Sequence, residues 1–330
     1  MTPKNEERLV LAIERIAELL EHYLPAVNVP NRNPRDNPEL DSQLIQPEPA
    51  TPPRRPDSEV GRRVLEHLAR LGFTVRKTAT DNALDNALAM TALFMGEHFA
   101  VLKEFLGRIK SALGYHGPFT LDLKGRPAEA ITLNCQLGTY LYKIAFLENY
   151  QYQKSPRYLI AARPSQMPAA QRFLTGQWFE IFCREKAIGL LREAGLASRI
   201  DYLKNVQATL PDGEEFEFDF LLALDDELFW FEQKTGSYQR HLERYASLVE
   251  RMGLDANHAF LVLLDVGEET SQVLGELCKM TVCDVESFES RLQTIIDRLD
   301  ILPIDGADED SDAELVFHAM PPANVEAGLP

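Results

Sequence analysis

Cysteine is scarce in this chain of 330 residues, which contains four. All lie within apolar stretches, and their spacing matches neither a zinc site nor a disulfide framework: Cys135, Cys183, Cys278 and Cys283. The sequence therefore predicts buried, reduced thiols, as in a protein of the reducing cytoplasm.

Long apolar runs are also missing. No uninterrupted apolar segment approaches the roughly 18 residues of a membrane span. The amino terminus, MTPKNEERLV, lacks a basic segment followed by an apolar one, which is typical of an export signal. We therefore expect a cytoplasmic location and no membrane partner.

Basic residues are outnumbered, with 34 Lys and Arg against 51 Asp and Glu, which gives a formal net charge of -17. Such a balance argues against general electrostatic attraction to nucleic acid, because phosphate contacts need clustered basic side chains. Part of the excess lies at the carboxyl end, where no Lys or Arg follows Arg298. We interpret residues 303–330 as an acidic tail that inflates the total.

The amino-terminal half falls into three predicted parts. Residues 1–24 contain a helix over 5–23 whose apolar residues follow a short heptad pattern. This helix needs a partner, which is the protein's own core, a second copy in a homodimer or a partner protein. Residues 25–56 form a Pro-rich linker, and residues 57–156 form a mainly helical domain of unknown role, with a strand at 118–123 and a last helix over 128–150.

From residue 157 the pattern changes to alternating helices and strands, and we assign residues 157–302 to one domain. A strand at 157–162 is followed by these expected elements: helix 171–195, strand 199–209, a hairpin over 216–234, helix 238–252, strands 259–265 and 280–285, and helix 286–299. This order predicts an α/β fold, a mixed sheet flanked by helices as in restriction endonucleases.

The hairpin carries the most informative pattern, FEFDFLLALDDELFWFEQK. Side chains alternate between the two faces of a strand, so Asp219 points away from Phe216, Phe218 and Phe220. A two-residue turn at Asp225–Asp226 pairs residues whose numbers sum to 451. It therefore places Asp219 opposite Glu232 and, by the same rule, Glu217 opposite Lys234.

Two carboxylates in directly opposed positions repel each other unless a cation lies between them, because opposed Cβ atoms are only about 5 Å apart. Hard divalent cations prefer oxygen ligands. Asp219 and Glu232 therefore predict a site for Mg²⁺ or Mn²⁺.

The order of helix, strand and hairpin, with an acid on one hairpin strand and Glu-x-Lys on the next, resembles the PD-(D/E)xK nuclease superfamily. Within it, FLTGQWFEIFCREKA, YLKNVQ, EFDFLL and WFEQKTG are similar to the endonuclease domain of the Card1-like CRISPR-associated nucleases. The resemblance covers about 157–300. It departs from the family at Gln177, which replaces the second glycine before Trp178, and at Gln233, which lies between Glu232 and Lys234.

The resemblance implies a role for each site residue. Asp219, Glu232 and the backbone carbonyl of Gln233 would hold the principal metal. Lys234 would orient the attacking water and offset charge developing on phosphorus. Glu180, on the helix that carries Trp178, would add a ligand and permit a second metal.

Three polar residues at the start of the following helix, Gln239, Arg240 and Arg244, are candidates for contacts with the substrate backbone, although a solvated helix face accounts for them equally well. Trp178 and Trp230 are predicted core residues. The family's Rossmann-like sensor of cyclic oligoadenylate has no counterpart in residues 1–156, so activation by such a messenger is not carried over.

These patterns favour a metal-dependent endonuclease that hydrolyses phosphodiester bonds in DNA or RNA, in a prokaryotic defence or CRISPR-linked system. The alternative is a catalytically inactive nucleic-acid-binding or scaffold protein that retains the fold. A third interpretation places the function in residues 1–156, acting as a helical interaction module.

Overall fold

The computed structural model describes residues 60–79 and 85–298. The expected helix over 5–23, the Pro-rich linker and the acidic tail lie outside the described residues.

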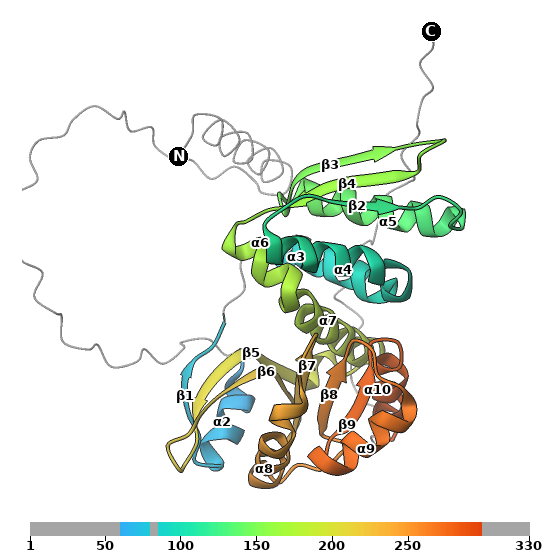
Figure 1. Cartoon of the computed structure of the whole chain (residues 1–330). Coiled ribbons are helices and arrows are strands. Elements are labelled where there is room, and N and C mark those ends of the chain that lie inside the picture. Colours follow the sequence, from blue (N-terminus) through green and yellow to red (C-terminus); the bar gives the residue numbers. More distant parts are fainter. Residues whose placement is uncertain (1–59, 80–84, 299–330) are drawn as a thin grey trace, which may run out of the picture.

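A six-stranded sheet forms the larger half of the structure (Figure 1). Its strand order is β1-β5-β6-β7-β8-β9, antiparallel from β1 to β7 and parallel from β7 to β9. The strands are β1 (Thr74–Lys77), β5 (Ile200–Thr209), β6 (Glu215–Leu224), β7 (Glu227–Lys234), β8 (Ala259–Leu263) and β9 (Thr281–Asp284). The predicted mixed sheet is confirmed.

Helices cover both faces of this sheet, as the α/β prediction requires. One face packs against α7 (Trp178–Glu193) and α10 (Phe288–Ile296). The opposite face packs against α2 (Arg62–Arg70), α8 (Leu242–Met252) and α9 (Glu268–Cys278). The two apolar clusters meet only through the sheet, which therefore has no solvated face over most of its area.

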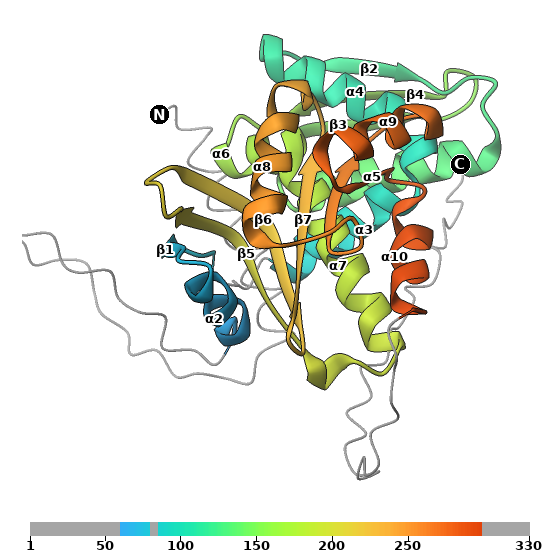
Figure 2. The same ribbon diagram turned by 90° about the horizontal axis from the view of Figure 1, so that it is seen from below.

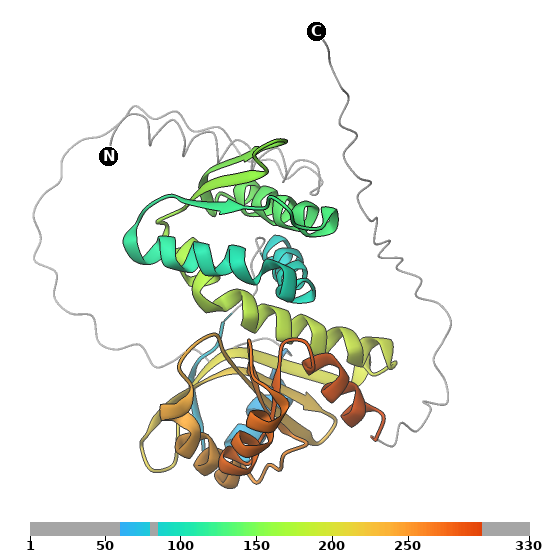
Figure 3. The same cartoon turned by 45° about the vertical axis from the view of Figure 1, so that its right-hand side comes forward.

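A second, three-stranded antiparallel sheet lies at the other end of the molecule, in the order β2-β4-β3. Its strands are β2 (Phe119–Asp122), β3 (Leu147–Gln153) and β4 (Leu159–Pro164), and its accompanying helices are α3 (Asp85–Glu97), α4 (Phe99–Tyr115) and α5 (Ala128–Lys143). Figure 3 shows α7 running between the large sheet and the layer of α3 and α4. A single apolar cluster runs from the small sheet through these helices to the large one.

Two elements from the predicted helical domain, β1 and α2, belong to the large sheet and its covering helices instead (Figure 2). Strand β1 pairs with β5 at the sheet edge, and α2 packs on the face of the sheet that α8 and α9 cover. The carboxylate of Asp201 on β5 accepts hydrogen bonds from the backbone amides of Gly61 (2.6 Å) and Arg63 (2.9 Å) at the start of α2. This contact stabilises the helix amino terminus, whose first amides have no partner within the helix.

The predicted helix over 128–150 is too long. Helix α5 ends at Lys143, Ala145 adopts a left-handed φ of 60°, and residues 147–153 form β3, which pairs with β4. Strand pairing therefore overrides the helical pattern at 144–150. Strand β1 and helix α9 were also not predicted.

The predicted helix over 171–195 has an interruption. It begins as α6 (Pro168–Arg172), passes through a π-helical turn (Phe173–Gln177) and continues as α7. Beyond α7, Gly195 has a φ of 76°, a conformation that glycine adopts without strain. Across the part of the chain that the structure describes, no helix has the length and apolar character needed to cross a membrane.

Candidate active site

The hairpin has the predicted register. Leu224 pairs with Glu227, Leu222 with Phe229, and Phe220 with Phe231, all joined by the two-residue turn at Asp225–Asp226. Asp225 adopts a φ of 50° in that turn, a conformation that aspartate tolerates better than most residues. Asp219 and Glu232 lie one step beyond the last of these pairs.

The alternation of faces is not regular along β6, and here the prediction was wrong. Phe216 and Phe218 pack on the α8 side of the sheet, whereas Phe220 packs on the α7 side. The switch falls at Asp219, across from Asn205 of β5, which has a φ of 47°. Asp219 therefore stands at a local distortion of two adjacent strands, where it borders cavities on both sides of the sheet.

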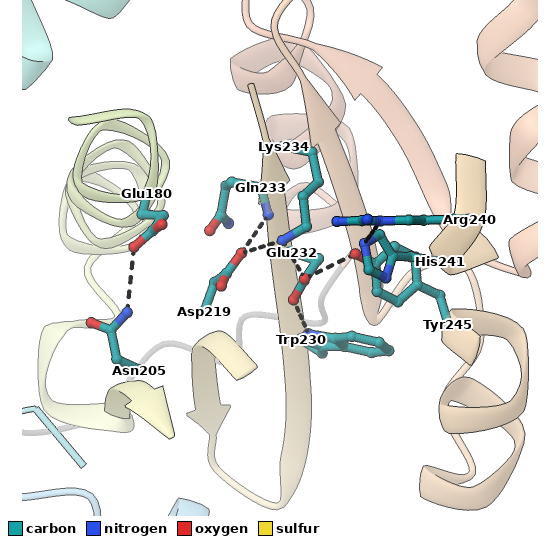
Figure 4. A network of polar contacts seen from close by, with 10 residues as sticks. All are labelled: Glu180, Asn205, Asp219, Trp230, Glu232, Gln233, Lys234, Arg240, His241 and Tyr245. Atoms are coloured by element: carbon teal, nitrogen blue, oxygen red, sulfur yellow. Dashed lines mark hydrogen bonds and ion pairs between the residues drawn. The ribbon is translucent and has the colours of Figure 1, made fainter. Parts of the chain in front are cut away.

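Glu232 is the most deeply buried acid of the site, with 3% of its surface exposed. Its Oε1 accepts hydrogen bonds from Lys234 Nζ (2.6 Å) and the Tyr245 hydroxyl (3.1 Å), and its Oε2 accepts one from Trp230 Nε1 (3.4 Å) (Figure 4). Burial, and then the nearby Asp219 carboxylate, raise the pKa of Glu232 to about 8.

Lys234 supplies the cation between the two carboxylates. Its Nζ lies 3.3 Å from Asp219 Oδ2 as well as 2.6 Å from Glu232 Oε1. Burial lowers the pKa of Lys234, but the two carboxylates outweigh it and raise that pKa above its ordinary value. Lys234 thus forms ion pairs with Asp219 and Glu232, whereas Glu217 accepts a hydrogen bond of 3.1 Å from Gln207 on β5.

Asp219 also accepts a hydrogen bond of 3.0 Å from the backbone amide of Gln233. Burial raises the pKa of Asp219, while Lys234 and the Gln233 amide act in the opposite direction. The carboxylate is thus held by two donors from the neighbouring strand, which fixes its orientation toward the end of β7.

Glu180 lies on the other side of the sheet, on α7. Its Oε2 accepts a hydrogen bond of 3.3 Å from Asn205 Nδ2. Burial, and then Asp219, raise its pKa to about 7. It lines a cavity of about 140 Å³ together with Asp219, Asn205 and Lys204.

Glu232 and Lys234 line a larger cleft of about 480 Å³ on the α8 side, which we call the α8 cleft. Its remaining lining residues are Arg76, Gln207, Ala208, Glu215, Phe216, Glu217, Asp219, His241, Arg244 and Tyr245. Asp219 borders both cavities, so it connects the acid on α7 with the pair on β7.

The predicted substrate contacts divide in two. Arg244 lines the α8 cleft, stacks over the Phe216 ring at 4.7 Å and forms an ion pair of 2.7 Å with Glu214. Gln239 and Arg240 are exposed and line neither cavity. Their contact with a substrate stays a prediction.

The donor chemistry of the site fits a hard divalent cation, since it offers the carboxylate oxygens of Asp219 and Glu232. Within residues 60–79 and 85–298, however, no three His, Cys, Asp or Glu side chains lie close enough together to hold a metal. Lys234 Nζ instead takes the place between Asp219 and Glu232. The metal assignments of Asp219, Glu232, Gln233 and Glu180 stay predictions.

Two polar partners escaped the sequence interpretation. Tyr245 lies in the apolar cluster on the α8 side of the sheet and donates to Glu232, and His241 stacks on its ring. Asn205 holds Glu180. A tyrosine within an apolar stripe carries no local signal that its hydroxyl will meet a carboxylate.

No protein-family model matches this sequence, and no curated protein matches it either. Among solved structures, the chain is similar to protein VC1899 from Vibrio cholerae, with 16% identity over 70% of this chain and 60% of that one, and a TM-score of 0.47. Can2 from Sulfobacillus thermosulfidooxidans, solved in complex with cyclic tetra-adenylate, gives the same values. The chain thus spans about three fifths of the length of each. At this identity and TM-score, the likeness assigns no activity.

Proposed function

We propose that this protein is a metal-dependent endonuclease that hydrolyses phosphodiester bonds in DNA or RNA. One observation carries the proposal. Two carboxylates on adjacent strands, the largely buried Asp219 and the fully buried Glu232, share the Lys234 ammonium at the wall of a cleft of about 480 Å³.

Burial of these acids is costly for the fold. Raised pKa values of Glu232 and Glu180, about 8 and about 7, mean that folding disfavours their ionised forms. Stability alone gives no reason to gather buried acids at one distorted point of a sheet. Strongly shifted acids beside a cleft are instead typical of sites that bind ions or move protons.

Each residue has a chemical role in this proposal. A divalent cation held by Asp219, Glu232 and the Gln233 carbonyl would polarise the scissile phosphodiester and lower the pKa of a water molecule. Lys234 has three N–H donors, so it can offer one to a phosphate oxygen and offset its developing charge. The Glu180 carboxylate, with a pKa of about 7, can accept a proton near neutral pH.

Substrate charge has to be balanced in an acidic cleft. Three basic side chains line the cleft, Arg76, Lys234 and Arg244, beside four acidic ones, Glu215, Glu217, Asp219 and Glu232. Bound cations would therefore be needed to balance the charge of a phosphodiester, which supports a metal requirement. The placement in a prokaryotic defence or CRISPR-linked system is supported by the sequence resemblance to Card1-like nucleases.

Cleavage assays test the proposal. Wild-type protein is incubated with single- and double-stranded DNA and RNA in Mn²⁺, in Mg²⁺ and in EDTA. We expect cleavage of at least one substrate with metal, none in EDTA, and none by Asp219→Asn with any substrate.

A matched control is available on the same hairpin. Asp226 is exposed at the turn, away from the cleft, so Asp226→Asn should cleave at the wild-type rate. Metal-independent cleavage, or equal cleavage by wild type and Asp219→Asn, would refute the enzymatic role.

A second candidate function is a nucleic-acid-binding or scaffold protein without catalysis. The observation in its favour is that Lys234 already forms ion pairs with both Asp219 and Glu232. In addition, the described residues contain no group of three His, Cys, Asp or Glu side chains that could hold a metal. Nucleic-acid binding by wild type and Asp219→Asn alike, without cleavage of any substrate in Mn²⁺, would favour this role.

A further inference from the structure

Gln233 has an unusual environment for a polar side chain. It is 4% exposed. Among the described residues, neither its side-chain Oε1 nor its Nε2 has a hydrogen-bond partner, and no second side-chain amide has both of its ends buried and unpaired. Since buried polar groups are nearly always paired, this amide calls for a polar ligand.

The side chain of Gln233 projects to the α7 side of the sheet. Its neighbour Phe231 and its parallel-sheet partner Val262 both belong to the apolar cluster on that side, whereas Glu232 and Trp230 face α8. Helix α7 packs directly against β7. In Figure 4 the amide points from β7 toward Glu180, on the opposite side of the strand from Glu232.

Gln233 is thus bound to the site by its backbone and aimed away from Glu232 by its side chain. Its backbone amide donates to Asp219 at 3.0 Å, while Glu180 Oε2 accepts a long hydrogen bond of 3.3 Å from Asn205. Glu180 lines the same cavity as Asp219, the carboxylate to which the Gln233 backbone donates.

We propose that Gln233 is a positioning residue whose side-chain amide orients Glu180 through a shared water molecule. This role rests on the proposed nuclease function. An amide offers two N–H donors and a carbonyl acceptor, so it can bind a water that donates to the Glu180 carboxylate. Gln233 would then fix the third acid relative to Asp219 without touching the reacting phosphate.

The test begins with stability, which needs no activity. Gln233→Met keeps the length of the side chain and removes both polar ends. We expect a Tm within a few degrees of wild type in EDTA, because the amide has no hydrogen-bond partner among the described residues and the Glu180 carboxylate lines a cavity where water can replace the lost bond. A Tm well below wild type would show that the protein itself binds the amide, and would overturn the proposal.

The second part measures cleavage on the substrate found in the assay above. We expect Gln233→Met to lower kcat about 10-fold with KM unchanged, as partners that orient a site residue do. The double variant Gln233→Met with Glu180→Gln should be no slower than Glu180→Gln alone, since both changes remove one interaction. The control is Gln272→Met, on exposed α9, which should match wild type.

The outcomes separate the two proposals. An inactive wild type refutes the nuclease function and this role with it. An active wild type with a fully active Gln233→Met refutes the role of Gln233 alone. A raised KM at unchanged kcat, or losses that add to those of Glu180→Gln, also overturns it.

Discussion

Removal of the Lys234 ammonium should destabilise the protein in a strongly pH-dependent way. Lys234→Met leaves Asp219 and Glu232 buried on adjacent strands without the cation that now lies 3.3 Å and 2.6 Å from them. Loss of one partner of a buried ion pair is costly because the other charge stays buried and uncompensated.

The size of the effect follows from the burial of the partners. Glu232 is 3% exposed and the Lys234 side chain is 26% exposed. Because this ion pair is only partly buried, we expect the free energy of unfolding to fall by an amount at the lower end of the range for buried ion pairs, about 3 kcal/mol. For a chain of 330 residues, that loss corresponds to a fall in Tm of about 4 °C.

The pH dependence has a definite sign. Glu232 has a folded-state pKa of about 8, above its ordinary value of 4.5, so the stability linked to its proton is present below pH 4.5 and is lost as pH rises through 8. In Lys234→Met the pKa values of Asp219 and Glu232 rise further. Glu232 is therefore neutral at pH 5, where the loss of stability should be smaller, and it is ionised at pH 9, where the loss should be larger.

Thermal unfolding of wild type, Lys234→Met and the exposed-loop control Lys124→Met, each in EDTA at pH 5, 7 and 9, gives the comparison. The expected Tm difference between wild type and Lys234→Met grows with pH, while Lys124→Met follows wild type. A difference that is constant with pH, or no larger than that of the control, would refute the electrostatic interpretation of the site.

Three further outcomes are expected. Tyr245→Phe removes a donor to Glu232 Oε1 and should lower stability by about 1.5 kcal/mol at pH 9, measured by urea unfolding; unchanged stability would contradict the bond. Glu180, with a folded-state pKa of about 7, should make wild type in EDTA less stable as pH rises from 4.5 through 7. Glu180→Gln should flatten the Tm profile between pH 4.5 and 7, and a profile that this substitution leaves unchanged would contradict the raised pKa of Glu180. Mn²⁺ should raise the Tm of wild type at pH 8 and not that of Asp219→Asn, and equal shifts would exclude Asp219 as a ligand.

The hairpin register was predictable because both of its determinants are local. The turn has two residues, Asp225 and Asp226, and the apolar alternation on either side leaves one pairing that buries the phenylalanines. Any odd loop length would have turned Asp219 to the other face. The observed pairs of Phe220 with Phe231 and Leu222 with Phe229 bear this out.

The switch of faces at Asp219 was not predictable from that alternation. It coincides with the left-handed backbone of Asn205 on the neighbouring strand, which depends on pairing between β5 and β6. The switch leaves Phe218 and Phe220 in different apolar clusters. A pattern with a period of two cannot indicate where a strand breaks that period.

Longer-range assembly explains the remaining differences. Residues 147–153 lack a strong strand pattern and become β3 because β4 pairs with them, and β1 is a strand of four residues at the edge of a sheet otherwise formed after residue 199. Tyr245 reaches Glu232 only because α8 packs beneath β7. Contacts of this kind depend on the tertiary fold and leave little trace in local sequence.

The most direct test of the account is the single-turnover cleavage rate in Mn²⁺ of wild type against Asp219→Asn, on whichever nucleic acid wild type cleaves. The account predicts a ratio of at least about 100, equivalent to about 2.7 kcal/mol of lost transition-state stabilisation. Equal rates, or no cleavage of any DNA or RNA by wild type, would contradict a metal-dependent nuclease site at Asp219, Glu232 and Lys234.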